Sequence, residues 1–341
     1  MALLELQKEG LYCAQADVYI DPWKPVASAL ITHGHADHAR WGSRHYLCTQ
    51  SAKPVLQYRL GRSSPIETVA YGERRQINGV KISFHPAGHI IGSAQIRLEY
   101  KGEIWVVSGD YKLEDDGLSE AFEPVPCHTF ITESTFGLPV YKWPDQEEVF
   151  QAINQWWADN QASGKTSVLT AYALGKAQRL LAGINPAIGP IFAHGAIENT
   201  NQIIRKQGIV LPPTPKIEAV KSKDQLAGAL VLATPSALGT AWMKRFKSTS
   251  TGMASGWMAL RGTRRRRAAD RGFVLSDHAD WEGLNQAVEA TGAERVYVTH
   301  GYTNTFVRWL REKGLEAYEL ETEFEGETGE MAATEETQET D

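Results

Sequence analysis

Residues 28–42, SALITHGHADHARWG, place three histidines and an aspartate within six positions, directly after a short apolar run. The run Ala29, Leu30 and Ile31 predicts a strand, and the polar cluster begins where that strand ends. The members of the cluster are His33, His35, Asp37 and His38. A single histidine after a strand is usually an ordinary polar residue, but four such groups at this spacing favour a metal site. Imidazole nitrogen and carboxylate oxygen are ligands that suit zinc or manganese.

Further polar residues follow other predicted strands: His89, Asp110, Glu133, His278 and His300. In layered α/β folds, the loops at strand ends carry binding and catalytic residues, so we expect these side chains to meet. Two ions about 3.5–4 Å apart can hold the attacking and leaving oxygens of a displacement at phosphorus, and Asp110 is placed to bridge them. We interpret His45, His85 and His128 as ordinary polar residues.

The pattern along the chain predicts one α/β unit inserted into another. Short strands dominate the first 135 residues, a helix with one apolar face is expected at 146–160, and strands then alternate with helices up to residue 233. Such alternation is typical of parallel strands. We expect a first part at 1–137, an insert at 138–271, a second part at 272–320 and a tail at 321–341.

Composition is that of an ordinary globular protein, with 42% hydrophobic and 22% charged residues. No apolar stretch approaches the roughly 20 residues that span a bilayer, and the N-terminus does not resemble a signal peptide. The three cysteines show no paired spacing, which favours a reducing compartment and a cytoplasmic location.

The net charge of −6 is misleading, because nine acidic residues and no basic ones lie in the tail. The remainder has 35 basic and 32 acidic side chains, a net +3 that is compatible with binding nucleic acid. The tail is rich in Glu and Thr and poor in large apolar residues, so we expect it to be disordered.

The motif THGHADH at 32–38 resembles the His-x-His-x-Asp-His signature of the metallo-β-lactamase fold. IDP at 20–22, AGHIIGSAQ at 87–95 and SGDYK at 108–112 follow in the expected order. ITESTFG, LSDHAD and VTHG resemble the additional motifs of the β-CASP nucleases. The longer strings at 126–144 and 254–281 look most similar to bacterial ligase-associated DNA exonucleases. The resemblance implies an αββα sandwich with an inserted α/β β-CASP domain.

The same resemblance implies roles for individual residues. One divalent ion, zinc or manganese, would be held by His33, His35, His89 and Asp110, and a second by Asp37, His38, Asp110 and His300. Asp21 would support the ligands from behind. The expected catalytic residues are Asp37, His278 as general acid, and Glu133, which would hold His278.

Contacts to nucleic acid are expected in the insert. Gly175 and Lys176 open a predicted helix whose N-terminus can hold a phosphate, although an ordinary strand–helix turn explains them equally well. His194 follows another strand and is either a cleft residue or a structural one. Arg264, Arg265, Arg266 and Arg267 belong to a basic run that is either a phosphate-binding strip or a solvated face.

The resulting hypothesis is a two-metal phosphodiesterase, a DNA exonuclease that acts on single-stranded ends in DNA repair. The alternative is an RNA-processing β-CASP ribonuclease, because a histidine at position 300 is typical of RNA-directed members. The resemblance also implies association with an ATP-dependent DNA ligase and a helicase, and no membrane partner. The insert argues against a small-molecule hydrolase of the same fold, and the complete ligand set argues against an inactive binding subunit.

Overall fold

The structure is a computed structural model that describes residues 2–260 and 269–324. The chain divides into two compact units, and the described residues of the first are 2–141 and 278–324. The second unit contains 142–260 and 269–277. The limits expected from the sequence for the insert, 138–271, stay a prediction.

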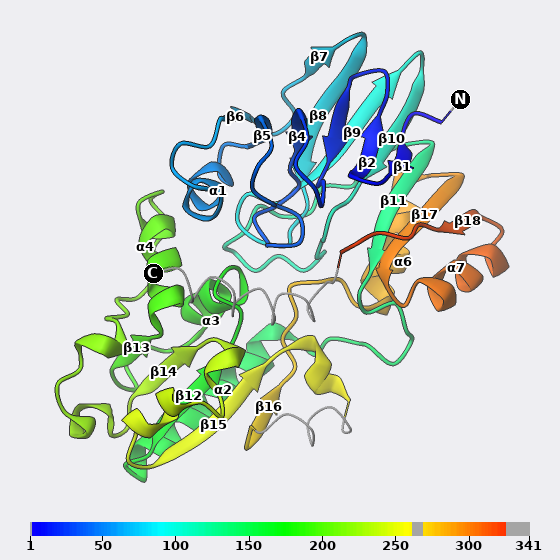
Figure 1. The fold of residues 1–341 in the computed structure, drawn as a ribbon. Helices are drawn as coiled ribbons and strands as arrows, with labels where there is room; N and C mark the ends of the chain where they lie inside the picture. The colour runs from blue at the N-terminus through cyan, green and yellow to red at the C-terminus, as the bar shows by residue number, and fades with distance from the viewer. Residues whose placement is uncertain (1, 261–268, 325–341) are drawn as a thin grey trace. The chain divides into compact units, whose positions relative to one another are not determined.

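The first unit is built on two sheets (Figure 1). One has six strands in sequential order: β1 (Glu5–Gln7), β2 (Gly10–Cys13), β3 (Val18–Ile20), β4 (Ser28–Leu30), β5 (His45–Thr49) and β6 (Ile66–Val69). The other has seven strands, in the order β18 (Glu316–Glu319), β17 (Arg295–Gly301), β11 (Thr129–Ser134), β10 (Glu103–Val107), β9 (Ala94–Tyr100), β8 (Val80–Pro86) and β7 (Arg75–Ile77).

Apolar side chains from both sheets form a shared core, so the sheets pack face to face. Ile20 and Leu30 of the first sheet belong to the same buried cluster as Phe84, Ile96 and Trp105 of the second. Helices cover the outer faces: α1 (Lys53–Leu60) on the first sheet, and α6 (Trp281–Thr291) and α7 (Thr303–Glu312) on the second. This four-layered arrangement confirms the predicted αββα sandwich.

The second unit contains a single parallel sheet in the order β13 (Ile191–Ala193), β14 (Leu230–Ala233), β12 (Thr166–Thr170), β15 (Thr249–Ala254) and β16 (Arg271–Phe273). Among the described residues of this unit, the helices are α2 (Gln146–Ala162), α3 (Lys176–Gly183) and α4 (Gly195–Arg205). Five short 3₁₀ helices lie at Ile217–Ala219, Lys223–Leu226, Pro235–Ala237, Ala241–Arg245 and Gly256–Ala259. The parallel α/β pattern predicted for this region is confirmed.

Helix α2 illustrates how the sequence determines a local element. The Asp145 side chain accepts a hydrogen bond from the Glu147 N–H at 2.7 Å, which caps the first turn. Trp156 and Trp157 are buried, and the Trp157 indole N–H donates to the Gly228 carbonyl at 3.0 Å. The two tryptophans therefore serve core packing, as the helical spacing indicates.

The structure also bears on the expectations for the cysteines, for membrane-spanning helices and for the charged segments. Cys13, Cys48 and Cys127 are buried free thiols. Within the described ranges, no helix has both the length and the hydropathy to cross a membrane. Arg264–Arg267 and most of the expected tail, from residue 325 onward, lie outside the described residues.

Candidate metal centre

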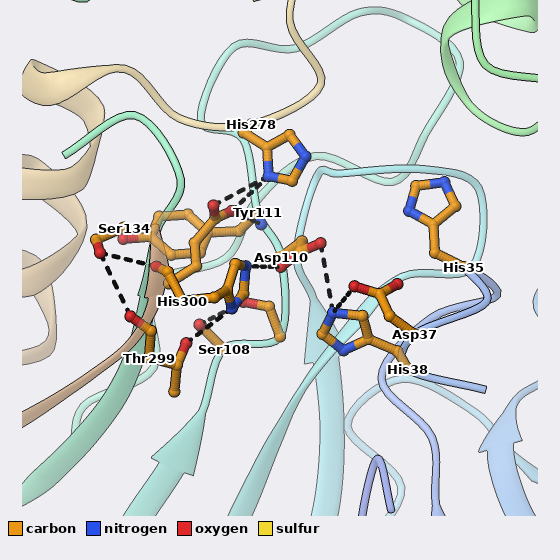
Figure 2. Close-up of polar contacts among 12 residues, drawn as sticks. His35, Asp37, His38, Ser108, Asp110, Tyr111, Ser134, His278, Thr299 and His300 are labelled. Carbon is orange, nitrogen blue, oxygen red and sulfur yellow. Dashed lines mark hydrogen bonds and ion pairs between the residues drawn. The ribbon is translucent and has the colours of Figure 1, made fainter. Parts of the chain in front are cut away.

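Polar residues expected at the strand ends lie close together in the first unit, and Figure 2 shows His38, Asp110, His278 and His300 among them. Ligand atoms within 4.8 Å of one another form one group of His33, His35, His89 and Asp110. A second group consists of His38, Asp110 and His300. The structure thus brings the residues expected at the two ions together, with Asp110 common to both groups.

The strand ends hold these loops in place through backbone contacts. The Ile31 N–H donates to the Leu47 carbonyl at 2.9 Å, and the Ala94 N–H donates to the Thr32 carbonyl at 2.8 Å. Gly109 has a φ of +57°, and a Cβ there would lie 2.7 Å from the Thr32 side chain. A glycine is therefore required directly before Asp110, because any side chain would push the β10 loop away from the β4 loop.

In the first group, three imidazoles surround one oxygen of Asp110. The Asp110 Oδ2 lies 3.5 Å from His33 Nε2 and 3.9 Å from His89 Nε2. His89 Nε2 also lies 3.0 Å from His35 Nδ1. All four side chains are buried, so their nitrogen and oxygen atoms converge on a small region away from bulk water.

In the second group, both oxygens of Asp110 take part. Its Oδ1 lies 3.1 Å from His300 Nε2, and its Oδ2 lies 3.6 Å from His38 Nε2. Asp37 joins this group, since its Oδ2 is 3.7 Å from the same His38 nitrogen. Asp110 therefore stands between the two groups, which is the position of a bridging carboxylate.

The hydrogen bonding around these atoms tests whether cations fit. Buried atoms with no hydrogen-bond partner among the residues the structure describes include His33 Nε2, His38 Nε2, His300 Nε2, Asp110 Oδ1 and both Asp37 carboxylate oxygens. Buried polar atoms without partners are costly and uncommon in proteins. Divalent cations at these points would satisfy them, and the donor set of nitrogen and oxygen suits zinc or manganese.

The electrostatics also favour positive charge at the centre. Burial lowers the pKa of His38, but the carboxylates of Asp37, Asp110 and Asp21 outweigh this effect and raise it to about 10. Burial and the neighbouring His38 hold the pKa of His33 well below its usual range, so His33 is a neutral imidazole. Despite burial, His38 and His300 hold the pKa of Asp110 well below normal, so it is a carboxylate.

Asp21 lies behind the ligands, where the sequence analysis expected it. One of its oxygens is 2.8 Å from His38 Nδ1, and the other accepts the Thr32 N–H at 2.8 Å. Its φ of 42° is unusual for a residue other than glycine and indicates local backbone strain. The surrounding hydrogen bonds hold it in this conformation, which directs its carboxylate at the imidazole edge.

A histidine–carboxylate pair lies beside the two ligand groups. His278 Nδ1 is 3.0 Å from each oxygen of Glu133, and both side chains are buried. Glu133 also accepts the Tyr111 N–H at 2.8 Å, which fixes its orientation. The His278 ring centre is 4.7 Å from that of His89, so the pair adjoins the first group.

The second unit contains the other candidate residues. Lys176 is fully buried, with its ammonium 4.7 Å from the centre of the Tyr172 ring and 3.9 Å from an Asp277 oxygen. The N–H of Gly175 donates to the side chain of Gln178 at 2.8 Å. His194 caps helix α4, because its Nδ1 accepts the Ala196 N–H at 3.2 Å. Each of these groups thus has a structural partner within the unit.

Three residues near the ligands were not singled out by the sequence analysis. Thr32 and Thr299 each place a hydroxyl beside the Nδ1 of the histidine that follows, at 3.0 and 3.1 Å. The repeated Thr-His-Gly at 32–34 and 299–301 is the sequence signal that could have revealed them. Phe324 belongs to the segment assigned to the tail, yet its ring stacks on His38 at 4.3 Å between centres.

Comparisons with known proteins agree with this geometry. No protein-family model matches the chain. The chain is 30% identical over 314 residues to a "Probable DNA ligase" of Opitutus terrae, a match covering 91% of this chain and 30% of the relative. It is 25% identical over 210 residues to an "RNase J-like protein" of Methanocaldococcus jannaschii, covering 51% of this chain and 48% of that protein.

A further match, 33% identical over 119 residues, is "Cleavage and polyadenylation specificity factor 73" of Drosophila melanogaster, covering 34% of this chain and 17% of that protein. The chain thus spans less than half the length of each of these relatives. A crystal structure of a protein of unknown function from Enterococcus faecalis V583 shares the fold, with a TM-score of 0.54 and 11% identity over 80% of this chain and 74% of that one. The chain is thus similar over part of its length to proteins named as RNA-processing nucleases, and its αββα sandwich and clustered motifs agree with the metallo-β-lactamase fold.

Proposed function

We propose that this protein is a metal-dependent nuclease that removes nucleotides from the ends of single-stranded DNA, with a role in DNA repair. The observation that carries the proposal is the position of Asp110 between two groups of histidines, beside the buried His278–Glu133 pair. A carboxylate placed to bridge two ions, with an adjacent proton donor, suits phosphodiester hydrolysis.

The residues would hold two divalent ions, zinc or manganese. One ion would be held by His33, His35, His89 and Asp110, and the other by Asp37, His38, Asp110 and His300. Such ions supply Lewis acidity and offset the charge that develops on phosphate oxygens. Asp21 keeps the His38 ring in position through its contact with Nδ1.

His278 is proposed as the general acid. Glu133 accepts a hydrogen bond from the N–H at His278 Nδ1, which stabilises the imidazolium and leaves Nε2 as the atom that gives a proton to the leaving oxygen. Burial of the pair strengthens their interaction, because the local dielectric is low. Solvent then restores the proton before the next turnover.

DNA is favoured over RNA by the extent of the similarities. The relative named as a probable DNA ligase matches 91% of this chain, whereas the RNase J-like relative matches 51%. An RNA-processing ribonuclease, acting as an endo- or exonuclease, is the second candidate, favoured by His300 and by the cleavage-factor relative.

We also propose a functional association with an ATP-dependent DNA ligase. The match covers only 30% of the Opitutus terrae protein named as a probable DNA ligase, so a region similar to this chain is part of a longer polypeptide there. A helicase partner is proposed on family resemblance alone. The three buried thiols are typical of a reducing compartment, and we propose a cytoplasmic location.

Nucleic-acid contacts are proposed at the arginines 264–267. They are also proposed at Gly175, Lys176 and His194, although the partners of these three residues within the second unit favour the structural alternative. The arginine run is the most testable of these, because phosphate contacts make binding dependent on salt. Replacing Arg265 and Arg266 by Glu should weaken binding to single-stranded DNA and flatten its salt dependence. An unchanged salt dependence would argue for a merely solvated face.

One gel experiment tests the proposed activity. Single-stranded DNA and RNA, each labelled at either end, are incubated with the protein and Mn²⁺, and the products are separated by length. We expect shortening of DNA from one end, and loss of activity in His35→Ala and Asp110→Ala. Cleavage of RNA alone would favour the second candidate, and undiminished cleavage by metal-stripped protein would contradict both.

A further inference from the structure

Three histidines, His33, His38 and His300, direct Nε2 toward Asp110. Each of these rings also has a polar contact at Nδ1. The Nδ1 partners are Thr32 Oγ1 for His33 at 3.0 Å, Asp21 Oδ2 for His38 at 2.8 Å, and Thr299 Oγ1 for His300 at 3.1 Å. A carboxylate is an obvious acceptor for an imidazole N–H. A hydroxyl is not, because it can either donate or accept.

The surroundings of Thr299 settle which role its hydroxyl plays. Its single hydrogen donates to the Thr132 carbonyl at 3.2 Å, and a carbonyl oxygen can only accept. A hydroxyl that donates to the carbonyl offers a lone pair to His300, and this favours a hydrogen on His300 Nδ1. The neutral ring then has its lone pair on Nε2, which lies 3.1 Å from Asp110 Oδ1.

The hydroxyl of Thr32 is also an acceptor toward the histidine that follows it, because of a different hydrogen bond. Its hydroxyl donates to Asp21 Oδ2, so it too can only accept from the following histidine. The hydrogen of His33 accordingly lies on Nδ1, and the lone pair on Nε2 faces Asp110 Oδ2 at 3.5 Å. Since Asp21 also contacts His38 Nδ1, one carboxylate orients histidines of both ligand groups.

We propose that Thr32 and Thr299 are positioning residues that fix His33 and His300 as Nδ1-protonated tautomers, so that each Nε2 is ready to bind a metal ion. The proposal rests on the metal centre of the proposed function but not on the identity of the substrate. Both threonines are buried, and each precedes its histidine in a Thr-His-Gly sequence. A purely structural role, filling space at a strand end, would be served equally well by valine.

The test compares valine, which keeps the shape, with serine, which keeps the hydroxyl. Thr32→Val, Thr32→Ser, Thr299→Val and Thr299→Ser are made in the full chain, with Thr68→Val on strand β6 as a matched control. Zn²⁺ affinity is measured by competition with a chromophoric chelator, and Co²⁺ absorption reports ligand geometry. Outer contacts of this kind are worth about 10–100-fold in metal affinity, so we expect losses of that order in the valine variants and near-recovery in the serine variants.

A direct readout is the tautomer itself. Long-range ¹H–¹⁵N spectra of ¹⁵N-histidine-labelled, chelator-treated protein should show Nδ1-protonated rings for His33 and His300, and mixed tautomers in the valine variants. Wild-type affinity in both valine variants, equal losses in valine and serine variants, or unchanged tautomers would each overturn the proposal. If Thr32→Val fails to fold, the Thr299 pair still decides the outcome. A protein that passes these tests but cleaves neither DNA nor RNA would refute the proposed function and leave this inference standing.

Discussion

His278 Nδ1 lies 3.0 Å from both carboxylate oxygens of Glu133, and neither side chain is exposed to solvent. The two residues lie on either side of the second unit in the sequence, Glu133 on β11 before it and His278 in the segment that precedes α6 after it. Their contact supports the proposed role of His278 as a proton donor, because the neighbouring carboxylate sets it apart from the proposed ligand histidines. It also makes the role of each residue separable by mutation.

His278→Ala should lower the rate of phosphodiester cleavage by about 10²–10⁴-fold, which is the usual contribution of a general acid. Metal content, measured on the same samples, should stay equal to that of the wild type, because His278 is not one of the proposed ligands. Glu133→Gln, which keeps the size of the side chain but not its charge, should give a smaller loss. If His278→Ala loses an ion instead, His278 is a ligand, an arrangement that the grouping of Asp110, Glu133 and His278 would allow.

Metal binding should stabilise the folded protein. Buried atoms such as His38 Nε2 and Asp110 Oδ1 have no hydrogen-bond partner among the described residues, so the ion-bound state removes an energetic cost. Adding Mn²⁺ or Zn²⁺ to chelator-treated protein should raise Tm, with about 2.7 kcal/mol gained at 100 times Kd. Calorimetry on His38→Ala, which removes one ligand, should show a smaller increase. Equal increases in both proteins would place the stabilising ion elsewhere.

The grouping of the proposed ligands could be predicted from the sequence because each follows a strand or lies at its end. The positions at strand ends and the motif spacing predicted that His33, His89 and His300 lie close together with Asp110 among them. The structure has this grouping. The apolar face of α2 was equally readable, because helical spacing alone determines which side is buried.

Contacts between distant residues could not be predicted in this way. The burial of Lys176 depends on Asp277, which lies far along the chain, and a helix N-terminus alone does not reveal such a partner. The contact of Phe324 was not predicted for another reason. The acidic composition of the surrounding segment indicated a disordered tail, and a single aromatic residue did not change that interpretation. The tautomer-setting hydroxyls depend on hydrogen-bond direction, which requires the acceptors of Thr32 and Thr299 to be known.

Phe324 should contribute to the second ligand group. Its ring is nearly parallel to that of His38, at 12°, and meets the edge of His300 at 5.9 Å between centres. Phe324→Ala removes this support, and we expect a loss of about 0.5–1.5 kcal/mol from the stacked pair together with weaker binding of one ion. Phe324→Tyr should retain both properties. Denaturant titration and metal competition measure the two effects, and unchanged values for the alanine variant would show that the contact contributes nothing.

His194 should make the protein less stable in mildly acidic solution. Burial, together with Arg245, lowers the pKa of His194 against the opposing effect of Glu218, and its Nδ1 must be unprotonated to accept the Ala196 N–H. Above pH 6.5, the ordinary value, both folded and unfolded chains hold a neutral ring, and the contribution to stability is fully present. As the pH falls below that value, the unfolded chain takes up a proton first, so the free energy of unfolding decreases until the pH passes the lowered pKa of the folded state.

Urea denaturation at pH 7.5 and 5.5 should therefore show a larger decrease in the free energy of unfolding in wild type than in His194→Asn, which keeps a capping oxygen and does not titrate. His194→Ala loses the cap at every pH, at a cost of about 1 kcal/mol. Identical pH dependence in wild type and the asparagine variant would mean that protonation of His194 is not resisted by the fold.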